Sequence, residues 1–370
     1  MRRPERHAPL TRGQAGFTLI ELLIVLGIAT FIMAGMVGLF RSNRTAFTLL
    51  DQMRILEENG RVAADYMSRE LRPAKLTSLI ALDNADATEY PTAQASLGAK
   101  AGTDIIRLFD SVLLIDPIYI QPGDFNANAA NVKFMETYMT GFPGYDPAMS
   151  QNELSNMLAQ YTALIYNCGS SPPHARTTGG GHCTQNITSG GDIGGGDTQI
   201  VYNRGVNTDN ANRPHDCSGG QDGSVAIDAA ASVCISIGHE YYYYVRSDDP
   251  GDASAAQTPQ LVRYILGSGN HEVVANNVED MQIEYGLDTD ATPDGVIDIW
   301  MPGSPDPAVM APEDILAVRV SYLMVTETDD TDKLAEAPIT LSNSTIDTIG
   351  VADQKRRRVI TRTTRMRNPS

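Results

Sequence analysis

The chain has 370 residues, a formal net charge of −17 and a hydrophobic content of 42%. That hydrophobic content is enough to bury a core, which excludes a wholly disordered chain. The acidity argues against a general nucleic-acid binder, because such a protein presents a basic surface. The length fits two modest domains or one large domain with insertions.

The first long feature is an apolar run at residues 17–40, which contains a single charged residue, Glu21. A helix of this length spans about 36 Å and crosses a bilayer core of ~30 Å. The short leader before it carries four Arg against one Glu. This bias predicts that the N-terminus stays cytoplasmic and that the chain after Arg41 lies outside. A cleaved secretory signal is the alternative, but the run is too long for a signal core and no small-x-small site follows it.

The start of this run reads Gly16-Phe17-Thr18-Leu19-Ile20-Glu21. The block resembles the type IV prepilin signature. The resemblance implies cleavage by prepilin peptidase between Gly16 and Phe17, removal of residues 1–16 as a leader peptide, and methylation of the new amine on Phe17. A carboxylate inside an apolar segment is costly, so we expect Glu21 to pair with the Phe17 amine of its own or an adjacent subunit. A role limited to peptidase recognition is the alternative.

The helix is expected to continue beyond the membrane. Apolar residues recur every three or four positions, at 46, 49, 50, 53, 56, 63, 64, 67 and 71. This spacing predicts an amphipathic helix, and Pro73 ends it. Residues 41–73 therefore form the amphipathic half of one long helix, whose apolar stripe packs on a globular head at residues 74–370.

The head shows short β-type runs separated by loops. The predicted strands are residues 104–110, 199–203, 232–237, 240–246, 261–266, 281–285, 315–326 and 358–367. Hairpins such as 240–266 need no crossover helix, so the sheet is expected to be antiparallel and the fold class α+β. Ser150 and Glu153 match a capping box before a short helix. That helix either packs on its own domain or docks to a partner.

Four cysteines lie in the middle of the chain, at Cys168, Cys183, Cys217 and Cys234. Disulfides are expected in an extracytoplasmic region. Of the three possible connectivities we favour 168–183 with 217–234, because each closes a short loop. Zinc is the alternative, since three His lie nearby, but no Cys-x-x-Cys pair is present. Residues 179–196 are rich in Gly and polar, which predicts a mobile loop.

The C-terminal third carries a second resemblance, to the minor pilin family called PilW. The segments that carry it are residues 240–246, 261–264, 278–288, 315–320, 356–361 and 367–368. Residues 85–235 do not share it and are expected to be an insertion peculiar to this branch. No nucleophile elbow, His-Glu-x-x-His pair or paired-carboxylate cleft can be read from the sequence, so we expect no enzymatic activity and no required cofactor.

The family resemblance implies a minor pilin that primes type IV pilus assembly at or near the tip and supports twitching motility, adhesion or DNA uptake. Its partners would be other minor pilins, the major pilin, a tip adhesin, prepilin peptidase and the inner-membrane assembly platform. The protein would sit in the inner membrane with a periplasmic head, and in the pilus after assembly. A pseudopilin of a type II secretion system, or a tip adhesin that binds a surface ligand through residues 85–235, are the alternatives.

Two charged segments remain. Asp288, Asp290, Asp294 and Asp298 form an acidic loop whose oxygen ligands suit Ca²⁺. The loop resembles an EF-hand loop, but two residues are inserted and no Glu stands at the twelfth place, so a solvated turn at Asp294-Gly295 is the alternative. The basic C-terminal segment alternates like a strand, and we expect a sheet strand with a basic exposed face rather than a DNA-binding tail.

Overall fold

The chain divides into two compact units, residues 1–53 and residues 54–370. The computed structural model describes a defined set of residues within them. These are residues 18–72, 80–82, 99–100, 102–112, 117–121, 124–126, 131–167, 182–202, 232–246, 259–265, 271–290, 294–302, 315–327, 339–341, 344–346 and 355–366.

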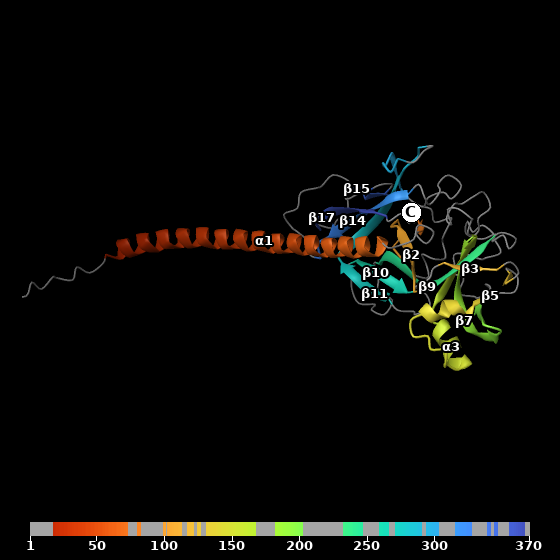
Figure 1. The fold of residues 1–370 in the computed structure, drawn as a ribbon. Helices are drawn as coiled ribbons and strands as arrows, with labels where there is room; N and C mark the ends of the chain where they lie inside the picture. The colour runs from red at the N-terminus through yellow and green to blue at the C-terminus, as the bar shows by residue number, and fades with distance from the viewer. Residues whose placement is uncertain are drawn as a thin grey trace, which may run out of the picture. The chain divides into compact units, whose positions relative to one another are not determined.

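Helix α1 (Leu19–Leu71) is a single unbroken helix of 53 residues (Figure 1). It confirms the predicted long helix and ends just before Pro73. In the first unit its large apolar side chains are exposed, for example Leu19 at 78% and Phe31 at 82%. By length and composition this helix can cross a membrane.

In the second unit one stripe of α1 is buried. Its members are Leu56, Gly60, Ala63, Ala64, Met67, Ser68 and Leu71. The spacing of three and four residues is the amphipathic pattern read from the sequence. Gly60 is an addition to that pattern: a Cβ there would collide with the side chain of Ile360 and approach Met324 to 3.2 Å. The missing side chain lets the sheet come close to the helix.

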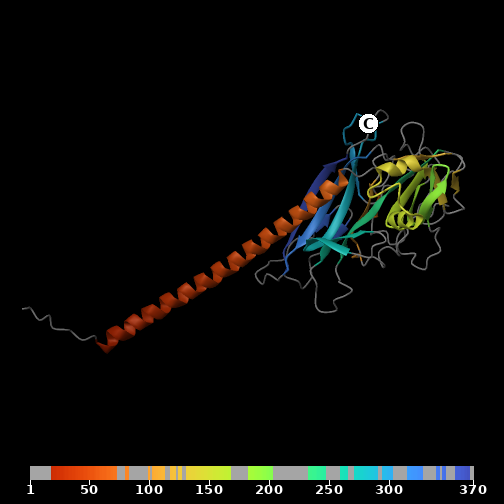
Figure 2. The same ribbon diagram turned by 60° about the horizontal axis from the view of Figure 1, so that its bottom comes forward.

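The sheet that covers this stripe has four antiparallel strands in the order β13-β12-β14-β17. Their bounds are β13 (Ile299–Pro302), β12 (Val278–Leu287), β14 (Ile315–Val325) and β17 (Arg357–Arg365). The central strand β14 is buried along almost its whole length. A polar link joins sheet and helix, because Asn59 Nδ2 donates to Asn277 Oδ1 at 3.1 Å. Figure 2 shows these strands beside the C-terminal part of α1.

The larger sheet has 11 strands. They are β1 (Ile80–Leu82), β2 (Ile105–Ser111), β3 (Ile118–Ile120), β4 (Phe125–Asn126), β5 (Asn131–Met135), β6 (Thr162–Asn167), β7 (His182–Gly194), β8 (Asp197–Tyr202), β9 (Val233–Arg246), β10 (Gln260–Ile265) and β11 (His271–Asn276). All pairings are antiparallel. A separate hairpin joins β15 (Ile339–Leu341) to β16 (Ser344–Ile346). These sheets and α1 confirm the α+β class.

Strand β9 corrects one detail of the sequence analysis, which predicted two strands at 232–237 and 240–246. The structure has one strand of 14 residues. Gly238 lies at the predicted break, and a Cβ there would collide with the backbone of Asp110 and Ser111 on β2. The glycine therefore marks a close approach between neighbouring strands rather than the end of a strand.

Residues 179–196 were predicted to be a mobile loop, and this prediction is wrong for the described part. Residues 182–194 form β7, which pairs with β6 and β8, and Ile187 is 2% exposed. Helix α3 (Gln151–Leu158) packs on β7, since a Cβ at Gly190 would collide with the Leu158 side chain. Two glycines at the tip, Gly195 and Gly196, have φ of 78° and 87° and make the hairpin turn.

The predicted capping box of α3 is confirmed. The Ser150 hydroxyl accepts from the Glu153 amide, and the Glu153 carboxylate accepts from the Ser150 amide at 2.8 Å. Leu154 and Leu158 of this helix are buried in a core shared with β5, β6, β8 and the 3-10 helix η2 (Glu136–Gly141). The short helix therefore packs on its own domain.

Candidate functional site

The start of α1 is held by a reciprocal cap. The Thr18 amide and hydroxyl each donate to Glu21 Oε2 at 3.0 Å, and the Glu21 amide donates to the Thr18 hydroxyl at 3.4 Å. This is a capping box, which satisfies N–H groups that a helix start leaves open. The carboxylate predicted to pair with an amine thus lies beside Thr18, the residue that follows Phe17. Gly16 and Phe17 themselves lie outside the described residues.

The sequence contained a signal for this cap. Thr18-x-x-Glu21 has the same spacing as Ser150-x-x-Glu153. The sequence analysis predicts a capping box only at Ser150, and for Glu21 it considers assembly and peptidase recognition but no cap. The structure adds a local role for Glu21, which is compatible with the predicted pairing once the new amine exists.

The basic C-terminal segment lies against acidic groups of the same chain. Arg357 makes two hydrogen bonds to Glu279, at 2.5 and 3.0 Å, and its side chain is only 3% exposed. Two further arginines of β17 reach α1. The ion pairs are Arg358–Glu57 and Arg362–Asp65. The predicted strand is confirmed, and three of its basic side chains have acidic partners within the fold.

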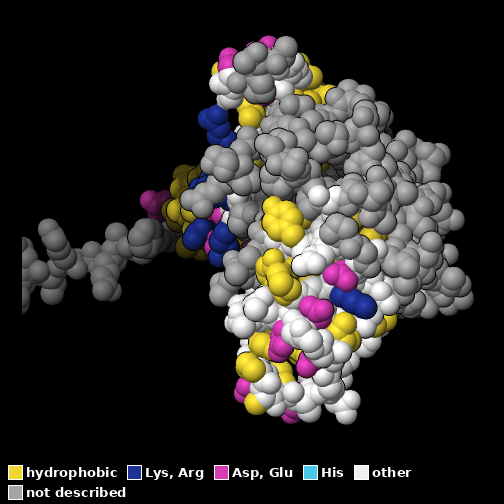
Figure 3. Space-filling view, turned by 45° about the vertical axis from the view of Figure 1, so that its right-hand side comes forward, with side chains coloured by type: hydrophobic (Ala, Val, Ile, Leu, Met, Phe, Trp, Pro, Cys, Tyr) yellow, Lys and Arg dark blue, Asp and Glu magenta, His cyan; other side chains and the backbone are white. Residues whose placement is uncertain are grey.

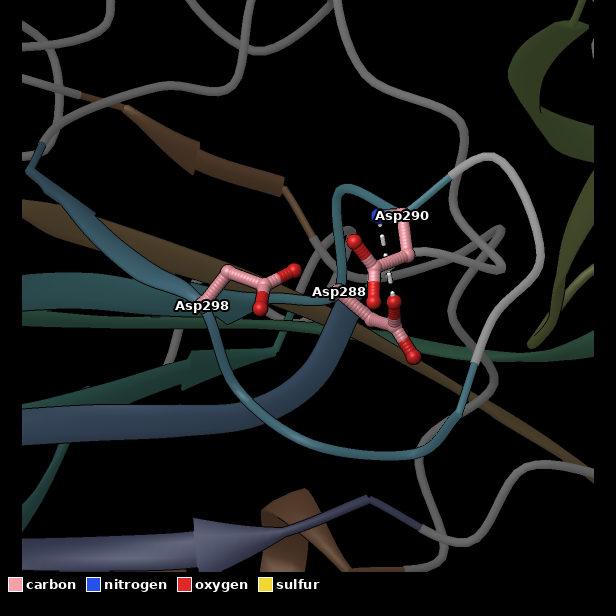
Figure 4. A group of neighbouring side chains, drawn as sticks. All are labelled: Asp288, Asp290 and Asp298. Carbon is pink, nitrogen blue, oxygen red and sulfur yellow. Dashed lines mark hydrogen bonds between the residues drawn. The ribbon is translucent and has the colours of Figure 1, made fainter.

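The acidic loop brings three of its four predicted aspartates together. One carboxylate oxygen from each of Asp288, Asp290 and Asp298 lies within 4.8 Å of the other two. Figure 4 shows the three side chains converging at the end of β12. Asp288 is buried at 1% exposure, whereas Asp290 and Asp298 are exposed.

Backbone donors hold two of these carboxylates in place. Asp288 accepts from the amides of Gly295 at 2.8 Å and Asp290 at 3.3 Å, and Asp298 accepts from the Thr289 amide at 2.6 Å. The nearby charge of Asp298, then slight desolvation and the charges of Asp294 and Asp288, raise the pKa of Asp290. Such repulsion between carboxylates is what a divalent cation relieves.

Asp294 is not a member of this group. Its carboxylate accepts from the Val296 amide at 2.8 Å and so supports the turn. Gly295, with φ of 77°, makes the bend, as the turn alternative predicted. The loop is also tied to β17, because Arg365 donates to the Gly295 carbonyl at 2.8 Å. The structure therefore favours three candidate ligands, with Asp294 in a structural position.

The cysteines are described only in part. Cys234 lies in β9, is fully buried and takes part in a disulfide. The side chains of Cys168, Cys183 and Cys217 lie outside the described residues, so the predicted pairing stays a prediction. Of the three histidines of the zinc alternative, His174 and His215 lie outside the described residues, and the side chain of His182 does too.

A row of aromatic and basic side chains was missed by the sequence analysis. The rings of Tyr161 and His239 lie 4.8 Å apart, and His239 lies 6.1 Å from Tyr241. Arg263 continues the row over the rings of Tyr241 at 5.1 Å and Tyr66 at 5.8 Å. These are cation–π distances. Alternation along residues 239–243 was the available signal, because every second residue of a strand shares a face.

The region of α3 carries an acidic patch around Tyr145. The Tyr145 hydroxyl donates to Glu136 Oε1 at 2.6 Å. This bond, with burial and the charges of Glu136, Asp192 and Asp146, raises the pKa of Tyr145 to about 12. In Figure 3 acidic side chains gather on the lower part of the face, where Figure 1 places α3 and β7.

Comparison with known proteins supports both resemblances. Residues 242–368 match the family model Type IV Pilus-assembly protein W, and residues 11–37 match the prokaryotic N-terminal methylation motif. The resemblance to a type IV minor pilin of the PilW family is confirmed. The first match covers about a third of the chain and includes β10 to β17.

Among solved structures, the chain is similar to the type IV-like pilin TTHA1219 from Thermus thermophilus. The two share 11% identity, the match covers 58% of this chain and 92% of that chain, and the TM-score is 0.20. No curated protein matches the sequence.

Proposed function

We propose that this chain is a minor pilin that primes type IV pilus assembly and sits at or near the pilus tip. The observation that carries the proposal is the pairing of the two matched parts in one fold. The segment with the methylation motif opens α1, and the PilW-like segment forms the sheet that packs on the same helix at Gly60. A head fixed on an anchoring helix suits a subunit that passes from a membrane into a filament.

The chemistry of assembly centres on Glu21. In the structure its carboxylate caps α1 through Thr18. Cleavage after Gly16 would create a positive amine on Phe17, one residue from that cap. In an apolar filament core, an unpaired carboxylate is heavily penalised. Glu21 would therefore exchange its capping bonds for the amine of an adjacent subunit, and this would set the axial register.

The test compares Glu21→Ala with Thr18→Ala in cells that lack the chromosomal copy. Glu21→Ala should still be cleaved, shown by mass spectrometry of the N-terminus, but should be depleted from sheared pili. Thr18→Ala loses the cap and keeps the carboxylate, so it should still be incorporated. Normal incorporation of Glu21→Ala would remove Glu21 from assembly, and normal piliation without the chain would refute the priming role.

The same deletion strain separates the alternatives. A type II pseudopilin would lose secretion while pili persist. A tip adhesin would leave pili that fail to attach; the acidic patch around Tyr145 in residues 85–235 is the surface that favours it. Prepilin peptidase, an assembly platform and other pilins are the partners of the proposed function. The proposed function places the head in the periplasm before assembly and in the pilus afterwards. This function requires no catalysis.

A further inference from the structure

Strand β9 changes its neighbours part-way along its length. On one edge, β6 pairs with residues 233–238 and β10 pairs with residues 241–246. On the other edge, β3 pairs with residues 233–235 and β2 pairs with residues 238–243. Residues 239–240 therefore lie between β6 and β10, at a junction of two parts of the 11-stranded sheet.

The two halves of β9 have different surroundings on one face of the sheet. Every second side chain of a strand shares a face. On this face Val233, Ile235 and Ile237 belong to the core that contains α3. Further along the same face, the Tyr243 hydroxyl donates to Glu70 Oε2 of α1 at 3.4 Å. The junction therefore separates the α3 core from the part of the sheet that packs on α1.

His239 lies at this junction. The centroid of its ring is 4.8 Å from that of Tyr161, which precedes β6, and 6.1 Å from that of Tyr241. Asp110 of β2 is the register partner of His239 across the other edge of β9. Gly238 lets β2 come close here, because a Cβ would collide with the Asp110 backbone. Three strands thus converge on one titratable side chain.

The imidazole connects the two parts of the head on this face. Tyr161 packs against the α3 core. On the other part, the Arg263 guanidinium lies 5.1 Å from the Tyr241 ring and 5.8 Å from the Tyr66 ring of α1. His239 contacts both Tyr161 and Tyr241, so it completes a row of rings from the α3 core to α1.

The opposite face of the junction is held by apolar contacts. Phe109 of β2 lies in one buried cluster with Leu164 and Tyr166 of β6. Glu240, the neighbouring carboxylate on β9, is buried and accepts a hydrogen bond of 2.8 Å from a tyrosine hydroxyl. Alternation along the strand places Glu240 on this opposite face. A junction that opens is therefore expected to open on the His239 face.

Burial and one carboxylate govern the charge of His239. Burial lowers the pKa of His239 below its ordinary value of 6.5, and the charge of Asp110 opposes this shift. The described groups that face the imidazole are this carboxylate and the rings of Tyr161 and Tyr241. Arg263 already lies over the Tyr241 ring, so a charged imidazole would be a second cation beside it. The closed junction therefore favours the neutral imidazole.

We propose that β9 is a hinge at residues 239–240, and that the contact of His239 with Tyr161 keeps this hinge closed until the imidazole is protonated. A charged imidazole is hydrated more favourably in water than in a partly buried site, so the ring leaves Tyr161. Acid thus frees the α3 core to turn relative to the part of the head that packs on α1.

The pH window follows from the two states of the hinge. In the open state the imidazole titrates near its ordinary pKa of 6.5, and in the closed state its pKa is lower. The open state therefore binds the proton more readily. The closed state is favoured above pH 6.5, and this advantage is lost as the pH falls below that value. Burial also raises the pKa of Asp110, so further acid removes the charge that attracts the imidazolium.

The experiment measures amide hydrogen exchange of the full chain in detergent at about pH 7.5 and about pH 5.5, on the two sides of the ordinary histidine pKa. Protection factors are compared, because they remove the intrinsic effect of pH on exchange. At the lower pH, protection should fall by at least about twofold in β2 near Asp110 and at the start of β6. The sheet β13-β12-β14-β17 should keep its protection and serves as the internal reference.

Three variants assign the effect. His239→Gln cannot be protonated, so its protection should be the same at both pH values. His271→Gln is the matched control, because it makes the same substitution at an exposed histidine of β11 outside the junction. It should respond like the wild type. Asp110→Asn removes the charge that opposes the lowered pKa of His239, so its fall in protection should exceed that of the wild type.

Three results would each overturn the proposal: equal protection of the wild type at both pH values, a His239→Gln variant that responds like the wild type, or a fall that extends to β12 and β14. Melting curves check that the variants fold. If His239→Gln does not fold, NMR titration of the wild-type His239 ring, assigned by its contact with Tyr161, decides instead. A pKa of 6.5 or higher there overturns the proposal. Neither measurement involves pilus assembly, so the result is independent of the proposed function.

Discussion

The PilW-like sheet and the middle region at residues 85–235 bury their cores differently. The sheet β13-β12-β14-β17 packs on the buried stripe of α1, with Gly60 at the closest approach. The middle region supplies most of a second core of 16 buried hydrophobic residues, into which α3 inserts Leu154 and Leu158. The described part of residues 85–235, which lies outside the family match, therefore buries a core of its own. The family match includes the whole sheet that covers α1 together with β10 and β11 of the larger sheet, whereas the second core forms almost entirely outside the match.

The comparison predicts that the two cores respond separately to cavities. Leu158 in α3 is 0% exposed and Leu56 in α1 is 1% exposed. Leu158→Ala and Leu56→Ala should each lower the free energy of unfolding by about 2–5 kcal/mol. Hydrogen exchange should rise in α3 and β7 for the first variant and in β14 and β17 for the second. Equal acceleration throughout the head in both variants would show a single cooperative core.

Overpacking at the two close glycine contacts should destabilise the protein less than the cavities do. Gly60→Val would press on Ile360 and Gly190→Val on Leu158. Overpacking typically costs about 1–3 kcal/mol, and thermal melting of the two variants measures it. A Gly60→Val protein that melts like the wild type would mean that Ile360 moves aside, and that the close approach of sheet to helix is not required.

The four-stranded sheet carries the acidic loop at the end of β12. Among its described residues, the middle region has no such cluster of carboxylates. If Asp288, Asp290 and Asp298 hold Ca²⁺, the ion at ten times its Kd should stabilise the head by about 1.4 kcal/mol. Asp290→Asn should abolish the rise in melting temperature. Asp294→Asn should keep it, since that residue caps the turn. No shift in the wild type at millimolar Ca²⁺ would leave the loop as a turn.

The cap of α3 offers a smaller test confined to the middle region. Ser150→Ala removes the two hydrogen bonds of the Ser150 hydroxyl, to the Glu153 amide and to the Glu153 carboxylate, and leaves the bond from the Ser150 amide to that carboxylate. The expected loss is about 1 kcal/mol, measured by chemical denaturation. Ser150→Asp keeps a capping oxygen and should retain most of the stability. A loss equal to that of Leu158→Ala would mean that the cap also supports the core.

The smallest effect concerns Tyr145. Its pKa is raised to about 12 from the ordinary value of 10.0, mainly by the bond to Glu136. The folded protein thus holds this proton more tightly than the unfolded chain. The Tyr145 hydroxyl therefore stabilises the fold below pH 10, and this stabilisation is lost between pH 10 and 12. Absorbance titration of the wild type against Tyr145→Phe isolates this group. Glu136→Gln should move the titration toward pH 10, and an unchanged titration would exclude Glu136 as the cause.

The sequence by itself determined the features that depend on neighbours along the chain. The apolar run at 17–40, the stripe that includes Leu56 and Met67, and the Ser150 cap are all spacing rules of one helix. The runs that form β10, β12 and β14 could be located from the sequence, because they contain the β-branched and aromatic residues that favour strands. The Gly16-Phe17 block and the PilW-like segments also carried the two resemblances that the family models match.

Only the tertiary structure decided what the glycines do and which charges meet. In the sequence Gly238 suggests a strand break and Gly190 suggests a loop. In the structure Gly238 lies against the backbone of β2, and Gly190 lies against the Leu158 side chain. Arg358 pairs with Glu57, although 301 positions separate them in the sequence. Asp298 lies close to Asp288, whereas Asp294 is not part of that carboxylate group. Such outcomes depend on distances between elements, which a local pattern does not contain. The physical reason is that contacts far apart in the chain exist only once helix and sheets have packed.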